Sequence, residues 1–381
     1  MYDLYCHYLS KLQNSGKLRQ LPAPSPQGHG VWIDFTTNDY LGLSHNPEAL
    51  NAADTAGKLY GVGATGSRLL SGNNALFEAF EAQIARDKHT ESALIFNSGF
   101  QANVGALSAL LDQHVLQALP LVFFDKLNHA SLYQAAFLSG AELIRYRHND
   151  MNHLEALLKK HCHSTRPKFI VTETVFGMDG DIAPLQDLVA LTSRYGALLY
   201  LDEAHATGVF GPHGYGISTT VNLTDIPHVI MGTFSKAVGS SGGYIACSHL
   251  IKNYLVNTAS GFIYSTAPSP IIIGAAAKGW EMLKSLDQER HNLQELAAYT
   301  RTQINNLGFN TGYSHSHIIP LIIGEENHAV SAQAALRDKG VNVSCIRPPT
   351  VPPKTARLRI ALTTSHGLAD IERLMEALKT L

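Results

Sequence analysis

The sequence is poor in the features that mark several large protein classes. Its 381 residues include only 4 cysteines, widely spaced and without a CxxC pair, which excludes a disulfide framework and a cysteine zinc site. Charged residues make up 16%, and the formal net charge of -2 argues against a protein that binds nucleic acid through electrostatics. No apolar run approaches the ~18 residues of a membrane span, and the first residues lack a signal-peptide-like stretch. With 45% hydrophobic residues, the composition predicts a folded, soluble, cytoplasmic protein.

The middle of the chain alternates short apolar runs with amphipathic stretches. The runs predict strands at residues 93–96, 121–124, 142–146, 168–172, 197–201, 229–233 and 244–247. Residues 74–88, 151–160 and 184–195 carry apolar side chains at helical spacing. Strands that alternate with helices pair in parallel through crossovers, so we predict an α/β fold with a mostly parallel sheet. Ligands of such sheets bind where the strands end.

Three segments are expected along the chain. Residues 1–45 read as an N-terminal arm with a short strand, and residues 46–270 as the large domain. Residues 271–381 read as a smaller α+β domain: a helical region to about residue 307, three short strands and a terminal helix over 368–381.

Gly61, Gly63 and Gly66 spell GxGxxG, the dinucleotide-binding fingerprint. The fingerprint requires a strand before the glycines and a helix after them. Here the preceding residues predict a helix, so we interpret the glycines as a loop that needs positive φ or close backbone approach. A nicotinamide-dependent dehydrogenase is therefore rejected.

Polar residues follow several of the predicted strands. Residues 97–103 begin a helix directly after a strand, a position that favours phosphate binding. An ordinary strand-to-helix turn would show the same sequence pattern. Asp202 ends a strand and can pair with a cation, with His205 three residues on, although Asp also caps turns. Lys236 follows another strand beside a glycine-rich stretch, where a desolvated amine can form a Schiff base, although most lysines are simply solvated.

Isolated histidines carry little information in a chain that contains 19 of them. His129 follows a strand, but alone it reads as a structural histidine. His161 and His163, and likewise His315 and His317, look like metal tracts but lack partners at metal-site spacing. We expect these two pairs to lie on the surface and predict no metal.

The strand-end residues matter as a set. Pyridoxal 5'-phosphate requires four kinds of group: a site for its phosphate, a side chain that packs on its ring, a carboxylate for its pyridine nitrogen and a lysine for its aldehyde. The sequence therefore predicts this cofactor.

Eight stretches carry a family resemblance over nearly the whole length. They are TNDYLGLSHNP (37–47), GATGSRLLSGNN (63–74), FNSGFQAN (96–103), NHASL (128–132), TETVFGMDGD (172–181), LDEAHATGVFG (201–211), GTFSKAVGSSGG (232–243) and IYSTAPSP (263–270). This collinear series resembles the α-oxoamine synthases, a branch of the fold-type-I pyridoxal-phosphate enzymes. The resemblance implies that fold, this cofactor and an acyltransferase reaction.

A shorter run, IRPPTVP at 346–352 with ARLR at 356–359, resembles the branch that condenses L-alanine with a pimeloyl thioester in biotin biosynthesis. The thioester is one of coenzyme A or of acyl-carrier protein. Two alternatives stay open: a sibling that uses glycine and a short acyl-coenzyme A, and a partner subunit that performs no chemistry.

The resemblance implies roles for the matching residues. Lys236 would hold the cofactor and remove the Cα proton, Asp202 would pair with the pyridine nitrogen, and His205 would bind the phenolic oxygen. His129 would stack on the ring.

Further positions match binding residues of the family. The amides of Gly99 and Phe100 would bind the phosphate, with Thr233 contributing. In the expected homodimer the site lies between subunits, and the segment that contains Thr266 would reach the phosphate of the other subunit.

Substrate contacts are implied as well. Arg359 would grip the amino-acid carboxylate with Asn38 nearby, and Arg19 and Thr350 would bind the acyl substrate. One departure is Gly177, where the family usually has Ser, so that hydroxyl contact is not expected here.

Overall fold

The computed structural model describes residues 1–19, 21 and 32–381, which form two compact units. The larger unit comprises Asn38–Phe176 and Ile182–His291. The smaller unit comprises Met1–Thr37, Gly177–Asp181 and Asn292–Leu381. Part of the predicted N-terminal arm, residues 20 and 22–31, lies outside the described residues. Within the described residues, no helix is both long and apolar enough to cross a membrane.

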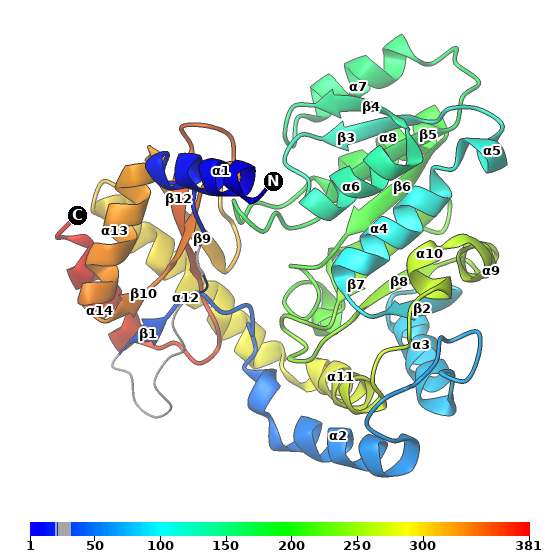
Figure 1. Ribbon diagram of the computed structural model, residues 1–381, viewed down its shortest axis with the longest axis horizontal. Helices are drawn as coiled ribbons and strands as arrows, with labels where there is room; N and C mark the ends of the chain where they lie inside the picture. The colour runs from blue at the N-terminus through cyan, green and yellow to red at the C-terminus, as the bar shows by residue number, and fades with distance from the viewer. Residues whose placement is uncertain (20, 22–31) are drawn as a thin grey trace. The chain divides into compact units, whose positions relative to one another are not determined.

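A seven-stranded sheet forms the centre of the larger unit (Figure 1). Its strand order is β2-β8-β7-β6-β5-β3-β4. The strands are β2 (Ser92–Phe96), β3 (Leu121–Asp125), β4 (Glu142–Tyr146), β5 (Lys168–Glu173), β6 (Ala197–Asp202), β7 (His228–Thr233) and β8 (Gly243–Cys247). Every strand predicted for this region is present, and the mostly parallel α/β fold is confirmed.

One strand departs from the parallel pattern. β8 runs antiparallel to both β7 and β2. The connection from β7 to β8 spans only residues 234–242, which is too short for the dozen or more residues of a parallel crossover. The chain therefore turns back directly, and this short connection is the segment that carries Lys236.

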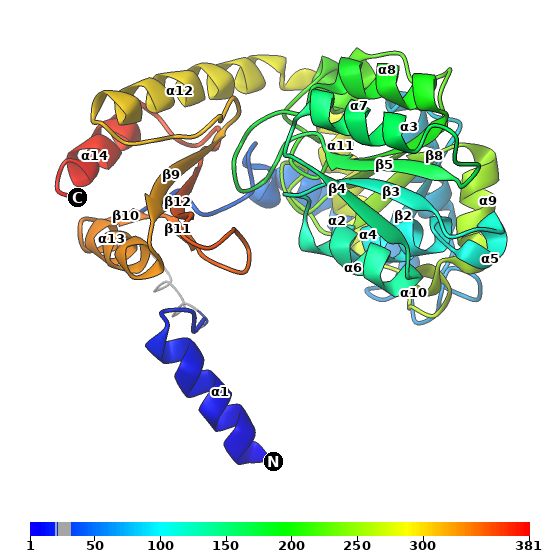
Figure 2. The same cartoon turned by 90° about the horizontal axis from the view of Figure 1, so that it is seen from above.

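Helices cover both faces of the sheet, as Figure 2 shows for α7 and α8 on one face and α4 and α6 on the other. The helices of this unit are α2 (Pro47–Tyr60), α3 (Ala75–Asp87), α4 (Gly99–Leu110), α5 (Gln113–Leu116), α6 (Ala130–Ser139), α7 (Met151–Lys160), α8 (Leu185–Tyr195), α9 (His249–Thr258), α10 (Ser260–Ile263) and α11 (Pro270–Met282). Side-chain caps fix several starts. Asn74 caps α3, Ser98 caps α4, and Asp150 caps α7.

A hydrophobic core lies between the sheet and the layer that contains α4 and α6. Phe96 and Phe124 from the strands pack with Leu107 and Leu132 from the helices, and all four are almost completely buried. Each such side chain contributes about 1.5–3 kcal/mol by leaving water. This packing holds the beginnings of α4 and α6 at the carboxyl ends of β2 and β3.

The smaller unit is built on a three-stranded antiparallel sheet of order β11-β12-β9 and a parallel pair, β1 with β10. Its elements are α1 (Tyr2–Asn14), β1 (Ile33–Asp34), β9 (Ile318–Gly324), α13 (Glu326–Asp338), β10 (Val341–Asn342), β11 (Ser344–Ile346), β12 (Ala356–Ala361) and α14 (Leu368–Leu378). Helix α12 (Asp287–Asn306) joins the two units in sequence. The α+β reading of this region agrees with these elements, while the expected boundary after residue 270 stays a prediction.

The predicted N-terminal arm contains helix α1, which was not expected; Leu4, Tyr5, Tyr8, Leu9 and Leu12 recur at helical spacing along it, yet none of its residues is buried. His317 is fully buried, which corrects the surface assignment of the His315 and His317 pair; it directly precedes the buried strand β9. The glycine loop behaves as interpreted: Gly61 ends α2 with φ of 86°, and a Cβ on Gly66 would overlap the Ser71 hydroxyl.

Candidate active site

A cavity of about 250 Å³ opens at the carboxyl ends of the central strands of the larger unit. It lies where ligands of parallel α/β sheets bind. Seven of the residues singled out in the sequence line it: Gly99, Phe100, His129, Asp202, His205, Thr233 and Lys236. The remaining lining residues are Ser98, Asn103, Ser131, Glu173, Ala204, Met231 and Ser235.

One wall of the cavity is the beginning of α4. Gly99 and Phe100 are its first two helical residues, so their amides have no acceptor within the helix. A Cβ on Gly99 would lie 3.3 Å from Cβ of Thr233, and one on Gly243 would lie 2.8 Å from Cα of Gly99. The Gly243 backbone and the Thr233 side chain thus lie close to Gly99, which places the Thr233 hydroxyl near the start of α4. An anionic group such as a phosphate fits this wall.

Another wall carries a buried carboxylate. Asp202 ends β6 and is only 3% exposed. Its Oδ1 accepts a hydrogen bond from the Ala204 amide at 2.9 Å, and its Oδ2 accepts one from Asn103 Nδ2 at 2.7 Å. Each oxygen retains a lone pair, so the carboxylate can still accept a proton-bearing ring nitrogen. The two walls together suit an aromatic cation that bears a phosphate.

His129 and Lys236 complete the set of titratable groups. The imidazole of His129 caps α6 by accepting the Ser131 amide. Desolvation lowers the pKa of His129; the charge of Asp202 raises it and that of Lys236 lowers it further. The three groups therefore interact electrostatically across one cavity.

Asn38 does not line the cavity but connects to it. The Tyr40 hydroxyl donates to Asn38 Oδ1 at 3.0 Å and lies 2.8 Å from Nδ1 of the buried His205. Thr266 lies elsewhere: its carbonyl accepts a hydrogen bond from Asn97 Nδ2 at 2.9 Å, close to the start of α4.

The other predicted substrate residues belong to the smaller unit. A guanidinium nitrogen of Arg19 donates to Thr350 Oγ1 at 3.0 Å, so the two positions expected to bind the acyl group contact each other. Arg359 is buried, and its Nε donates to the Gly177 carbonyl at 2.6 Å. The residue that departs from the family pattern thus contacts this arginine through its backbone.

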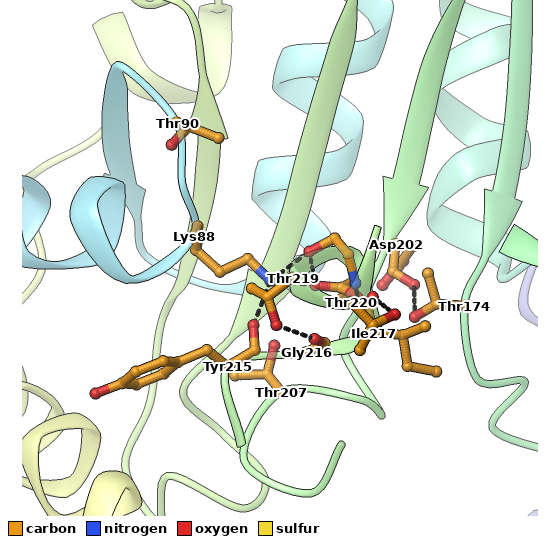
Figure 3. Close-up of polar contacts among 12 residues, drawn as sticks. Lys88, Thr90, Thr174, Asp202, Thr207, Tyr215, Gly216, Ile217, Thr219 and Thr220 are labelled. Atoms are coloured by element: carbon orange, nitrogen blue, oxygen red, sulfur yellow. Dashed lines mark hydrogen bonds and ion pairs between the residues drawn. The ribbon is translucent and has the colours of Figure 1, made fainter. Parts of the chain in front are cut away.

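A buried polar cluster supports the segment Asp202–His205 from outside the cavity (Figure 3). Lys88, directly after α3, donates to the Tyr215 carbonyl at 2.6 Å and to Ser218 Oγ at 2.9 Å, and it pairs with Glu203. In the same view Asp202 lies beside Thr174, whose amide donates to the Asp202 carbonyl at 2.9 Å. A Cβ on Gly216, which has φ of 100°, would overlap the Glu203 carboxylate.

Comparisons with known proteins agree with this geometry. Residues 31–378 match the family Aminotransferase class I and II. The 8-amino-7-oxononanoate synthase of Gluconacetobacter diazotrophicus is 44% identical over 91% of this chain and 87% of its own. A Paramagnetospirillum magneticum protein, provisionally named as the same synthase, is 46% identical over 99% of this chain and 97% of its own.

The chain belongs to the 8-amino-7-oxononanoate synthase family.

Solved structures support the family's fold for this chain. The 8-amino-7-oxononanoate synthase of Francisella tularensis has a TM-score of 0.77 at 28% identity, covering 92% of this chain and 97% of that one. A serine palmitoyltransferase structure with pyridoxal phosphate has a TM-score of 0.88 at 28% identity, covering 100% of this chain and 96% of that one. The fold-type-I assignment and the resemblance to α-oxoamine synthases are confirmed.

Sequence reasoning gave no role to several residues around the cavity in this member of the 8-amino-7-oxononanoate synthase family. Asn103, Ser131, Glu173 and Tyr40 are the clearest cases. Asn103 lies four residues after Gly99 and so faces the same side of α4, a spacing that could have revealed it. Ser131 lies two residues after His129 and Glu173 ends β5, so their positions could also have indicated a role, whereas Tyr40 reaches the site only through its contact with His205. Among the described residues no cluster of His, Cys, Asp and Glu could hold a metal ion, and the expectation of no metal stays a prediction.

Proposed function

We propose that this chain uses pyridoxal 5'-phosphate to condense L-alanine with a pimeloyl thioester. The products are 8-amino-7-oxononanoate, carbon dioxide and the free carrier. A C–C bond forms between the alanine Cα and the acyl carbonyl, the C–S bond breaks, and the alanine carboxylate leaves as carbon dioxide. The observation that carries this proposal is the grouping of Lys236, Asp202, His129 and His205 around one cavity beside the amides of Gly99 and Phe100.

The cavity walls suggest how the cofactor is held. The Gly99 and Phe100 amides with Thr233 would bind its phosphate, and Asp202 would keep the proton on its pyridine nitrogen. His205 would hydrogen-bond its phenolic oxygen and His129 would pack on its ring. Bound there, the cofactor supplies an electron-withdrawing system for the amino acid.

The chain's own residues would then move the protons. Lys236 Nζ would first hold the cofactor's aldehyde carbon and, once alanine has displaced it, accept the proton from the alanine Cα. The same amine would return a proton to the product carbon after decarboxylation. Arg359 would bind the alanine carboxylate, with Asn38 assisting, and Arg19 and Thr350 would bind the acyl substrate.

We further propose a cytoplasmic homodimer in which the segment containing Thr266 serves the second subunit's phosphate site. The acyl carrier is coenzyme A or acyl-carrier protein. Light scattering at several protein concentrations tests the dimer, since a monomer at all of them would contradict it.

A substrate matrix tests the proposed function. Initial rates are measured with L-alanine or glycine, each paired with pimeloyl- or acetyl-coenzyme A. We expect the highest kcat/KM for alanine with pimeloyl-coenzyme A. A preference for glycine with acetyl-coenzyme A would assign the chain to the sibling activity. Cofactor binding without turnover of any pair would identify a partner subunit without chemistry.

A further inference from the structure

Asn103 lies at the centre of a hydrogen-bond network between two walls of the cavity. Its side chain is 1% exposed on α4. Its amide nitrogen donates to Asp202 Oδ2 at 2.7 Å and to Ser131 Oγ at 2.9 Å. Its amide oxygen accepts the Tyr200 hydroxyl at 2.9 Å. Both protons and the oxygen of this amide are thus engaged.

The chemistry of the partners fixes which way the amide faces. The Asp202 carboxylate can only accept hydrogen bonds, so the group 2.7 Å from its Oδ2 must be the NH2 of Asn103. The amide oxygen then faces Tyr200, whose hydroxyl can donate. The reverse orientation would place two acceptors against each other in a buried site, at a cost of about 1–3 kcal/mol.

The hydrogen bonds of Ser131 determine which ring nitrogen of His129 carries the proton. Ser131 Oγ accepts from Asn103, so its own proton is directed to His129 Nδ1, 2.8 Å away. The backbone N–H of Ser131 also donates to Nδ1, at 3.3 Å. Because two donors converge on Nδ1, this nitrogen is an acceptor. The ring proton then resides on Nε2, for which the described residues offer no partner.

We propose that Asn103 is a positioning residue that fixes the orientation of both Asp202 and His129, two groups that line the cavity. It holds the Asp202 carboxylate directly and, through Ser131, keeps His129 in the neutral form with its proton on Nε2. This inference deepens the function proposed above and rests on it for its role in the reaction.

Two consequences follow for the site. A hydrogen bond to its charged form stabilises the Asp202 anion that a protonated pyridine requires. A neutral His129 adds no positive charge beside Lys236, and this agrees with the direction in which desolvation shifts the pKa of the imidazole, which is downward. Protonation of Nδ1 would oppose both Ser131 donors.

Histidine nitrogen NMR on the purified protein without added cofactor tests the network. His129 is assigned by difference from a His129→Gln variant. We expect a pyridine-type shift for Nδ1 and a pyrrole-type shift for Nε2. Ser131→Ala should broaden this into a tautomer mixture, whereas Ser139→Ala, on the same helix but bonded only to the backbone of Ala136 and Ala141, should not. A wild-type signal with the proton on Nδ1 would overturn the inference.

Two variants distinguish the hydrogen bonds that Asn103 donates from its contribution to packing. They are Asn103→Leu and Tyr200→Phe. Asn103→Leu should weaken pyridoxal-phosphate binding by about 10- to 100-fold, the usual value of a hydrogen bond to a charged group, and raise the pKa of His129 in the NMR titration. Tyr200→Phe keeps both Asn103 donors and should change the affinity less than about threefold. Wild-type affinity and an unchanged His129 titration in folded Asn103→Leu would contradict the proposal.

The outcomes distinguish this inference from the proposed function. A wild-type protein with the expected tautomer but no pyridoxal-phosphate binding would disprove the proposed function, while the proposed hydrogen-bond network would still be supported. A wild-type protein that turns over alanine but carries its His129 proton on Nδ1 would disprove only the network. If Asn103→Leu does not fold, the wild-type tautomer and Ser131→Ala still decide the matter.

Discussion

Lys88 and Glu203 form an ion pair whose side chains are both fully buried. Glu203 directly follows Asp202, so the pair fixes the backbone that presents Asp202 and His205 to the cavity. Every proton of the Lys88 ammonium has a partner, since it also bonds Tyr215 and Ser218. Burial lowers the pKa of Lys88, and the charge of Glu203 opposes this shift. Such a pair costs desolvation energy and serves best as a constraint on position.

We expect the loss of one partner of this ion pair to destabilise the folded protein strongly. Lys88→Met leaves the Glu203 charge buried, so we expect the free energy of unfolding in urea to fall by about 3–5 kcal/mol. The double variant Lys88→Met/Glu203→Leu should recover most of that loss. Lys252→Met is the matched control: this lysine pairs with Glu81, which retains Arg68, and its side chain is 26% exposed. A loss no larger than that of the control would contradict the account.

Replacing Asp202 tests its proposed partnership with the pyridine nitrogen. Asp202→Asn removes the negative charge and turns an amide toward the Asn103 donors. We expect pyridoxal phosphate to bind still, through the amides of α4, while kcat falls by roughly 10- to 100-fold or more. The measurement is steady-state kinetics with alanine and pimeloyl-coenzyme A, with cofactor content determined on the same sample. An unchanged kcat would remove Asp202 from the mechanism.

His129 makes stability depend on pH in a defined direction. Desolvation lowers its pKa in the folded state below the ordinary value, so the unfolded state binds more protons between the two values. The free energy of unfolding without cofactor should therefore fall as the pH drops below about 6.5. His129→Gln should flatten this dependence, whereas His114→Gln, on the exposed helix α5, should leave it unchanged. A steeper fall in His129→Gln would show the sign to be wrong.

Arg19 and Thr350 contact each other in the smaller unit at the positions expected to bind the acyl substrate. Arg19→Ala should raise the KM for pimeloyl-coenzyme A about tenfold and leave kcat within about twofold, as expected for loss of a binding contact alone. The exposed Arg373→Ala on α14 is the control for general loss of charge. Equal effects of the two variants on KM would rule out a specific role for Arg19.

Much of the larger unit could be predicted because its strands are short and continuously apolar. Burial on both faces of the sheet leaves that pattern in the sequence, and each strand end then indicates where Asp202, Thr233 and Lys236 lie. The antiparallel β8 was not predicted, since strand direction depends on the length of the connection and on which neighbour the strand joins.

The network around the cavity was harder to predict. Asn103, Ser131 and Tyr200 come from three different elements and meet only in the folded chain. In the sequence, Lys88 looks like any solvated lysine. Its neighbours do not indicate that it pairs in the folded chain with Glu203, which lies 115 positions further along. Roles that depend on one segment can be read from the chain; pairings between segments need the structure.

The central claim is that Lys236 holds pyridoxal phosphate in this cavity. The direct test is to mix the protein with the cofactor, reduce the C=N bond with borohydride and map the modified peptide by mass spectrometry. The account predicts a phosphopyridoxyl group on Lys236, with no labelled peptide in Lys236→Ala. A wild-type protein labelled on other lysines, or not labelled at all, would contradict it.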